Sequence, residues 1–167
     1  MRNIYLVGMM GSGKTETALA LAEILGMKAV DLDDLIVQEE RRSINEIFDQ
    51  KGEAYFRDAE SRGLRQVSIK KNLVVATGGG TILREDNRKI LLQTGKVFYL
   101  SASLEILWER LQSMQDRPLL KVAEPKVVLE RIYEERRPYY EMFENQVDTD
   151  LKTPEDVARE ISEILEK

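Results

Sequence analysis

The segment that most constrains the fold of this chain begins at Gly8 and reads GMMGSGKT through Thr15. It matches the spacing G-x-x-x-x-G-K-[S/T], in which the backbone N–H groups of a glycine-rich loop surround phosphate oxygens. The apolar run NIYLV precedes the loop, and the run KTETALALAEIL, rich in alanine and leucine, follows it. This pattern predicts a strand, a loop and a helix in that order, with a nucleotide phosphate bound at the helix N-terminus.

The rest of the chain repeats the alternation of strand and helix. Short apolar runs predict five strands, at residues 3–7, 28–32, 72–77, 96–100 and 145–149. Helix-type spacing is found at residues 14–25, 43–50, 53–70, 84–93, 103–112 and 124–137, and capping signals predict a last helix after Thr153. The first four strands are apolar on both faces, as in a parallel sheet covered on both sides. We therefore predict an α/β three-layer sandwich with a five-stranded parallel sheet.

Composition excludes several kinds of chemistry. The chain contains no cysteine and no histidine, so it has no disulfides, no thiolate or imidazole metal ligands and no histidine base. Acid–base catalysis must therefore come from carboxylates, lysine or tyrosine. The net charge of −5 argues against nucleic-acid partners. The chain also lacks the run of about 20 apolar residues that a membrane span needs, so we expect no membrane partner and a cytoplasmic location.

The residues of the phosphate loop have expected roles. The backbone around Gly11, Ser12 and Gly13 is expected to surround the phosphates. Lys14 is expected to reach the β- and γ-phosphates, and the Thr15 hydroxyl is expected to ligate Mg²⁺. Glu16 is unusual beside a polyphosphate, because like charges repel. Its side chain either points to solvent or lowers the affinity for the nucleotide, and both interpretations remain open.

Aspartates follow the second predicted strand, at the edge of the sheet where open parallel sheets bind ligands. Asp31 and Asp33 are two residues apart, so an extended backbone is expected to project both toward the same face. One is expected to support Mg²⁺, and the other is expected to meet the hydroxyl group that accepts the phosphoryl group. Asp34 is expected to cap the next helix.

Several segments of the sequence resemble the motifs of a known family, the shikimate kinases, and occur in the same order. The segments that resemble its motifs are DLD from Asp31, Phe56-Arg57 with Glu60, TGGG from Thr77, DRPLL from Asp116 and RRPYY from Arg136. The resemblance covers essentially the whole chain. It implies a P-loop fold of the nucleoside-monophosphate-kinase type, with residues 1–167 as a single kinase domain. It also implies that ATP and Mg²⁺ are used to phosphorylate the 3-hydroxyl of shikimate, in aromatic amino-acid biosynthesis.

The resemblance further implies the residues that hold the substrate. Asp33 would bind the shikimate hydroxyls and act as the base, while Asp31 would support Mg²⁺. Arg57 and Arg136 would pair with the shikimate carboxylate, which suits the planar fork of a guanidinium group. The glycines that would line the substrate site are Gly78, Gly79 and Gly80. A helical segment at about 32–61 would bind the substrate.

The resemblance also assigns two arginines to the nucleotide. Arg117 would sit on a lid at about 112–124 and contact the transferring phosphate, so the implied catalytic residues are Lys14, Asp33 and Arg117. Arg110 would pack near the adenine. The expected partner is a small molecule, shikimate, and the expected protein is a monomer.

Other functions remain open on the sequence alone. A gluconate-type or other small-molecule kinase would share the fold, but the paired arginines and the TGGG segment argue against it. A GTP-binding switch is disfavoured, because LSASLEIL follows the fourth predicted strand where a guanine-reading segment N-K-x-D would stand. A non-catalytic nucleotide-binding protein is suggested only by Glu16.

Overall fold

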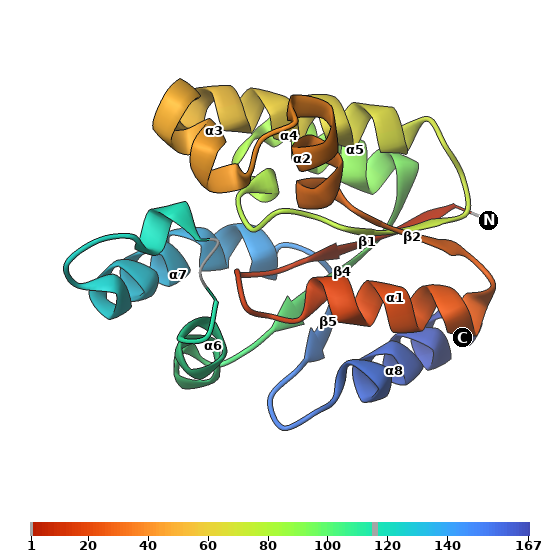
Figure 1. The fold of residues 1–167 in the computed structure, drawn as a ribbon. Helices are drawn as coiled ribbons and strands as arrows, with labels where there is room; N and C mark the ends of the chain where they lie inside the picture. Colours follow the sequence, from red (N-terminus) through yellow and green to blue (C-terminus); the bar gives the residue numbers. More distant parts are fainter. Residues whose placement is uncertain (1, 115–116) are drawn as a thin grey trace.

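The computed structural model describes residues 2–114 and 117–167, and its strands form one five-stranded sheet (Figure 1). The strands are β1 (Asn3–Val7), β2 (Lys28–Asp31), β3 (Leu73–Ala76), β4 (Gly95–Ser101) and β5 (Asn145–Asp148). They lie in the order β2-β3-β1-β4-β5, and all neighbours are parallel. The predicted parallel α/β fold is therefore confirmed, and each predicted strand end lies within one residue of the observed one.

Two helices cover one face of the sheet. They are α1 (Lys14–Leu25) and α8 (Pro154–Glu166), which lie side by side below the sheet in Figure 1. Leu21 of α1 and Ile161 of α8 are fully buried and pack in one apolar cluster with Leu6 of β1. The capping box predicted at Thr153 is present, because its hydroxyl accepts from the Asp156 backbone at 3.1 Å.

The other face carries the larger core. Its helices are α4 (Glu53–Ser68), α5 (Glu85–Thr94), α6 (Leu104–Leu111) and α7 (Pro125–Glu141), which pack around Tyr5, Val75 and Tyr99 of the sheet. Two short helices, α2 (Leu32–Glu40) and α3 (Ile44–Lys51), pack on α4 with a small core of their own. Short 3₁₀ turns occupy Thr81–Leu83 and Pro118–Leu120. No helix in the described ranges is long and apolar enough to span a bilayer.

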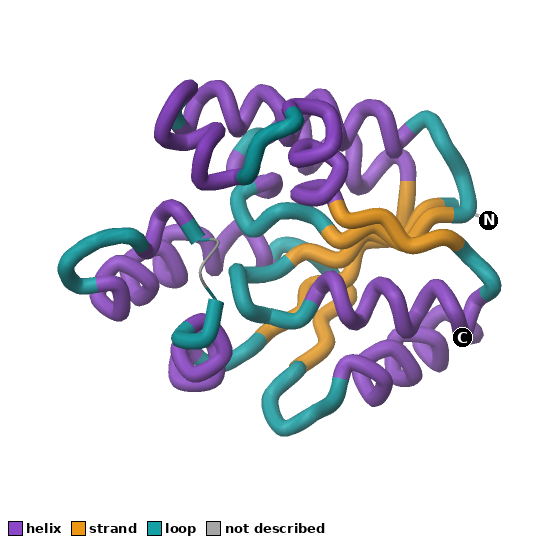
Figure 2. The backbone as a smooth tube through the Cα atoms, in the orientation of Figure 1, coloured by secondary structure: helices purple, strands orange, loops and turns teal. Residues whose placement is uncertain are grey.

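The central strand β1 determines where the phosphate loop lies. Every residue of β1 is buried, and the strand pairs with β3 on one edge and β4 on the other. Thr77 ties the end of β3 to β1, because its backbone N–H and its hydroxyl both donate to the Leu6 carbonyl, at 3.1 and 2.9 Å. Because all the strands are parallel, the loops that follow them gather at one end of the sheet, away from both termini (Figure 2).

The chain turns into a helix earlier than predicted after β2. Leu32, which is fully buried, begins α2, so Asp33 lies in a helical turn and not in extended backbone. Asp31 is the N-cap of α2: its Oδ1 accepts from the backbone N–H groups of Asp33 and Asp34, at 2.8 and 3.2 Å. The predictions that Asp34 caps this helix and that an extended backbone aligns Asp31 with Asp33 are therefore wrong.

The seventh helix is longer than predicted. Helix-type spacing was found only as far as Arg137, and a proline inside a helix lacks the N–H for the helical bond and crowds the preceding turn. The observed α7 continues through Pro138 to Glu141. The ring of Tyr140 is fully buried and stacks on Tyr99, with centroids 5.1 Å apart. This tertiary packing overrides the local preference of proline.

Candidate active site

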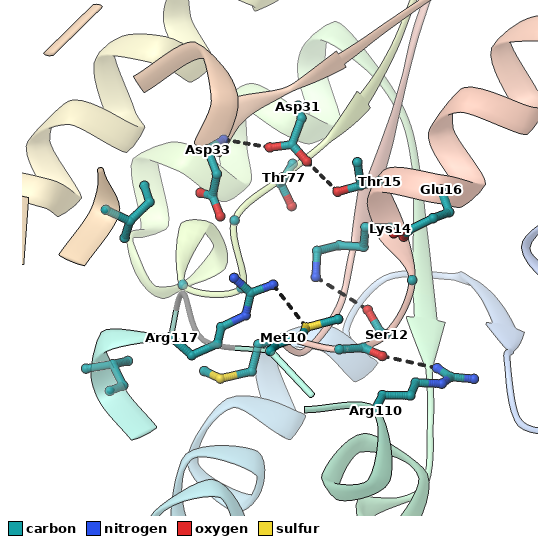
Figure 3. A pocket seen from close by; sticks show the side chains of 18 of the residues that line it. Met10, Ser12, Lys14, Thr15, Glu16, Asp31, Asp33, Thr77, Arg110 and Arg117 are labelled. Atoms are coloured by element: carbon teal, nitrogen blue, oxygen red, sulfur yellow. Dashed lines mark hydrogen bonds between the residues drawn. The ribbon is translucent and has the colours of Figure 1, made fainter. Parts of the chain in front are cut away.

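The loops at the carboxyl ends of the strands surround a cleft of about 460 Å³ (Figure 3). This volume suits a small molecule, for which clefts of roughly 300–1,000 Å³ are usual. Every residue predicted from the sequence to act in the site lines this cleft: Gly11, Ser12, Gly13, Lys14, Thr15, Asp31, Asp33, Arg57, Gly78, Gly79, Gly80, Arg110, Arg117 and Arg136. The fold thus brings together side chains that lie far apart in the sequence.

The phosphate loop folds around the amino group of Lys14. Gly13 is the N-cap of α1 with φ of 84°, a conformation that residues with a Cβ rarely adopt. Lys14 Nζ donates to the carbonyls of Gly8 and Met9, at 2.8 Å in each case. Burial lowers the pKa of Lys14 to about 8, while the negative charge of Asp33 opposes that shift. The ammonium group of Lys14 is therefore a buried positive charge that lines the cleft. Glu16 is exposed at its rim.

Oxygen atoms suited to a hard cation lie beside the loop. The Thr15 hydroxyl donates to Asp31 Oδ2, and Asp31 Oδ1 caps α2 as described above. Among the described residues, no group of three or more acidic, histidine or cysteine side chains could hold a metal ion. A divalent cation at Thr15 and Asp31 would therefore need further ligands from water or a nucleotide, which is how Mg²⁺ is usually bound.

Asp33 has an unusual carboxylate. Burial and the negative charges of Glu60 and Asp31 together raise the pKa of Asp33 to about 7, against the opposing positive charge of Lys14. Its Oδ1 is buried and accepts no hydrogen bond within the described part of the chain. Because a buried polar atom without a partner is costly, this oxygen marks a place where a ligand hydroxyl can bind. A carboxylate with a pKa near neutrality can also accept a proton at physiological pH.

Two arginines converge on the TGGG loop. Arg57 Nη1 pairs with Glu60 at 2.6 Å and Nη2 with Glu53 at 3.3 Å, whereas its buried Nε has no partner among the described residues. A Cβ at Gly80 would lie 2.1 Å from Arg57 Nη1, so only glycine leaves room for this guanidinium. Arg136 is 5% exposed, and its Nη1 would lie 3.2 Å from a Cβ at Gly79. The cleft therefore presents two buried guanidinium groups along the TGGG loop.

Two further arginines lie nearer the phosphate loop. Arg110 donates to Gly11 O and Thr149 Oγ1 at 3.2 Å and to Thr149 O at 3.1 Å, which links α6 to the loop. The Arg117 side chain points into the cleft, and its positive charge contributes to the lowered pKa of Lys14. Arg117 belongs to the lid predicted at about 112–124. Residues 115 and 116 of that lid, including Asp116 of the DRPLL segment, lie outside the described residues.

Sequence reasoning missed the apolar wall of the cleft. Ile44, Phe48 and Phe56 line it, and the rings of Phe48 and Phe56 lie 4.9 Å apart. Apolar residues at helical spacing look the same whether they face a core or a ligand. Glu60 was noted only as part of a motif, although it is 1% exposed and paired with Arg57. An acidic residue three positions after an arginine in a helix was the available signal.

The chain is similar to known kinases over nearly its whole length. The shikimate kinase family model matches residues 10–166. A shikimate kinase of Sulfurihydrogenibium sp. (strain YO3AOP1) is 42% identical over 161 residues, which cover 96% of each chain. A solved structure of the shikimate kinase from Acinetobacter baumannii in complex with shikimate is 37% identical, with a TM-score of 0.95, and the match covers 99% of this chain and 93% of that one. A deoxyadenosine kinase from M. mycoides with bound dATP has a TM-score of 0.65 at 16% identity and 100% coverage of both chains, which shows a shared fold alone.

Proposed function

The chain belongs to the shikimate kinase family, and from this membership we propose that its cleft transfers the γ-phosphoryl group of ATP to the 3-hydroxyl of shikimate. As a member of that family the protein is an enzyme, a kinase that uses ATP. The observation that supports the acceptor most directly is the convergence on the TGGG loop of two buried arginines and of the Asp33 oxygen that has no partner among the described residues. A small anionic polyol needs this combination of charges.

The nucleotide would occupy the side of the cleft formed by the phosphate loop. Lys14 would exchange its bonds to the Gly8 and Met9 carbonyls for the β- and γ-phosphates. Thr15 and Asp31 would hold Mg²⁺, and their paired hydroxyl and carboxylate supply oxygen ligands that this ion prefers. When bound, Mg²⁺ supplies positive charge that stabilises the phosphates during transfer. Arg110 would lie beside the adenine.

The acceptor would occupy the side formed by α2, α4 and α7. Arg57 and Arg136 would donate hydrogen bonds to the carboxylate of the acceptor. Asp33 Oδ1 would accept the proton of the attacking hydroxyl. The hydroxyl oxygen then bonds to the γ-phosphorus, the bond to the β-phosphate oxygen breaks, and ADP leaves. Arg117 would neutralise the charge that develops on the transferring group. The segment 32–61 would bind the acceptor, and the lid at 112–124 would exclude water.

Release of ADP from ATP–Mg²⁺ in the presence of different acceptors tests this proposal. We expect release with shikimate, and little with quinate or gluconate. Release with gluconate but none with shikimate would assign the cleft to another sugar-acid kinase. The monomeric state and the cytoplasmic location expected from the sequence stay predictions, and light scattering of the purified chain tests the first.

Removal of either carboxylate-binding arginine should weaken shikimate binding. In Arg57→Ala or Arg136→Ala, the acceptor anion loses half of its charge-assisted hydrogen bonds. Such bonds contribute about 1.5–3 kcal/mol each, so we expect the Kd for shikimate to rise about 10- to 100-fold. The Kd for ATP should change little, because the phosphates are held elsewhere. Titration calorimetry with each ligand measures both constants.

Arg62→Ala is the matched control for Arg57→Ala, because Arg62 lies on the same helix, α4, but its side chain is 47% exposed and pairs with Glu40. It should bind shikimate normally. The variant that lacks both Arg57 and Arg136 should fall short of additivity, since the two arginines serve one group. If the wild-type protein bound an analogue with a hydroxymethyl group as well as it binds the acid, the arginines would not be the carboxylate site.

The activity should fall on the acidic side of neutrality. Asp33 must be ionised to accept a proton, and its pKa is raised to about 7 by burial and by Glu60 and Asp31. The fraction of active enzyme therefore decreases as pH drops below that value. We expect kcat/KM for shikimate, measured at saturating ATP–Mg²⁺, to fall about tenfold per pH unit in this range. A flat profile between about pH 5 and pH 8 would contradict the role of Asp33 as the base.

A further inference from the structure

The last turn of α7 carries a buried tyrosine that has no role in the reaction proposed above. The side chain of Tyr140 is fully buried, and its ring lies nearly parallel to that of Tyr99, with 9° between the two planes. Its hydroxyl donates a hydrogen bond to the carbonyl of Gly79, in the TGGG loop. The extension of α7 beyond Pro138 brings this hydroxyl to the loop.

Tyr140 and Arg136 meet the loop at the same residue. They are four positions apart in α7 and therefore lie on the same face of the helix. Arg136 Nη1 would be 3.2 Å from a Cβ at Gly79, and the Met10 backbone nitrogen of the phosphate loop would be 3.4 Å from it. Arg136 Nη1 and the phosphate loop therefore both lie beside Gly79, and the Tyr140 hydroxyl bonds to its carbonyl.

The tyrosine is a hydrogen-bond donor throughout the working range of pH. Burial raises the pKa of Tyr140 to about 12, although the positive charge of Arg136 acts in the opposite direction. The hydroxyl therefore stays protonated and can hold the Gly79 carbonyl under all ordinary conditions. A phenylalanine at this position would keep the buried ring that stacks on Tyr99, and it would remove the hydroxyl that makes this bond.

We propose that Tyr140 is a positioning residue for the acceptor: its bond to Gly79 fixes the distance between α7 and the TGGG loop, and thereby places the Arg136 guanidinium against the acceptor carboxylate. This proposal rests on the function proposed above, because it takes Arg136 as a carboxylate ligand. It adds a residue that does not touch the substrate. Lys14, the side chain assigned to the phosphates, is held by the Gly8 and Met9 carbonyls, so nucleotide binding should depend much less on Tyr140 than acceptor binding does.

Steady-state kinetics of Tyr140→Phe test this role. We expect KM for shikimate to rise about tenfold, the change that corresponds to loss of one ordinary hydrogen bond. KM for ATP should be unchanged. Tyr99→Phe is the matched control, because it removes a hydroxyl from the other ring of the same stack and Tyr99 is not among the residues that line the cleft. This control should show a normal KM for both substrates.

Two further measurements separate positioning from stability alone. In an Arg136→Ala background, Tyr140→Phe should raise KM for shikimate by much less than tenfold, because the residue it positions is gone. Gly79→Ala keeps the tyrosine but places a methyl group 3.2 Å from Arg136 Nη1 and 3.4 Å from the Met10 backbone nitrogen, so it should raise KM for shikimate, with a smaller rise in KM for ATP. It provides a second route to the same contact if Tyr140→Phe does not fold.

Three results would overturn the proposal. They are a normal KM for shikimate in Tyr140→Phe or in Gly79→Ala, equal increases in KM for both substrates, and an equal effect of Tyr99→Phe. Each of these is measured against a wild-type enzyme that phosphorylates shikimate. If the wild-type enzyme does not act on shikimate, the proposed function fails first, so the two failures are distinguishable.

Discussion

Asp33→Asn is expected to lower kcat by about 10²- to 10⁴-fold, the usual contribution of a general base. Asparagine keeps the size of the side chain, but its amide cannot accept a proton at neutral pH. The chain contains no histidine that could replace the carboxylate. ATP should still bind, because the phosphate loop is intact. Turnover at saturating shikimate and ATP–Mg²⁺ measures the first effect, and calorimetric titration with ATP measures the second.

Asp34→Asn is the matched control for this variant. Asp34 is the next residue in α2 but is exposed, and its backbone N–H, not its side chain, bonds to Asp31. Its replacement should leave kcat within a small factor of the wild-type value. Turnover close to normal in Asp33→Asn would show that another group takes the proton, and Glu60 would then be the next carboxylate to test.

Lys14→Met is expected to lower kcat by at least about 10²- to 10³-fold, the loss seen when one preorganised donor to a developing charge is removed. Methionine has a similar length but no charge, so the β- and γ-phosphates lose their direct cationic partner. The affinity for ATP should fall as well, since the same group binds the ground state. Kinetics at several ATP concentrations distinguish the two effects.

Replacement of a lysine outside the cleft provides the comparison. Lys89→Met removes a side chain that is 58% exposed and pairs with Glu85 on α5. It should leave turnover and ATP binding unchanged. Circular dichroism should confirm that Lys14→Met is folded, because Lys14 also bonds to the Gly8 and Met9 carbonyls. A folded Lys14→Met enzyme with ordinary activity would show that the phosphates bind elsewhere.

Features that depend on nearby residues were predictable from the sequence. The phosphate loop, its strand and its helix follow from the spacing of a few glycines and apolar residues within one segment. The remaining strands follow from short apolar runs, because a strand buried on both faces leaves few alternatives. The roles of the arginines and of the TGGG loop were predicted from the resemblance to a family. Periodicity alone would have assigned these residues to ordinary helices and turns.

Features that depend on distant contacts were not predictable. Whether Asp31 or Asp34 caps α2 depends on the burial of Leu32 against residues of other elements. Continuation of α7 through Pro138 depends on the stack between Tyr140 and Tyr99, which a local rule for proline cannot include. The raised pKa of Asp33 likewise results from burial and from Glu60 on another helix. None of these contacts leaves a signal in the spacing of neighbouring residues.

The place of β1 at the centre of the sheet has a consequence for synthesis on the ribosome. β1 emerges first, but its two neighbours, β3 and β4, end at Ala76 and Ser101. Until Ser101 has left the exit tunnel, a strand whose residues are all buried in the native sheet has at least one edge unpaired. Unpaired apolar strands promote aggregation of nascent chains, so this chain should depend on early shielding by a chaperone. The phosphate loop is thus translated directly after β1, yet its supporting strand is complete on both edges only once β4 has been made through Ser101.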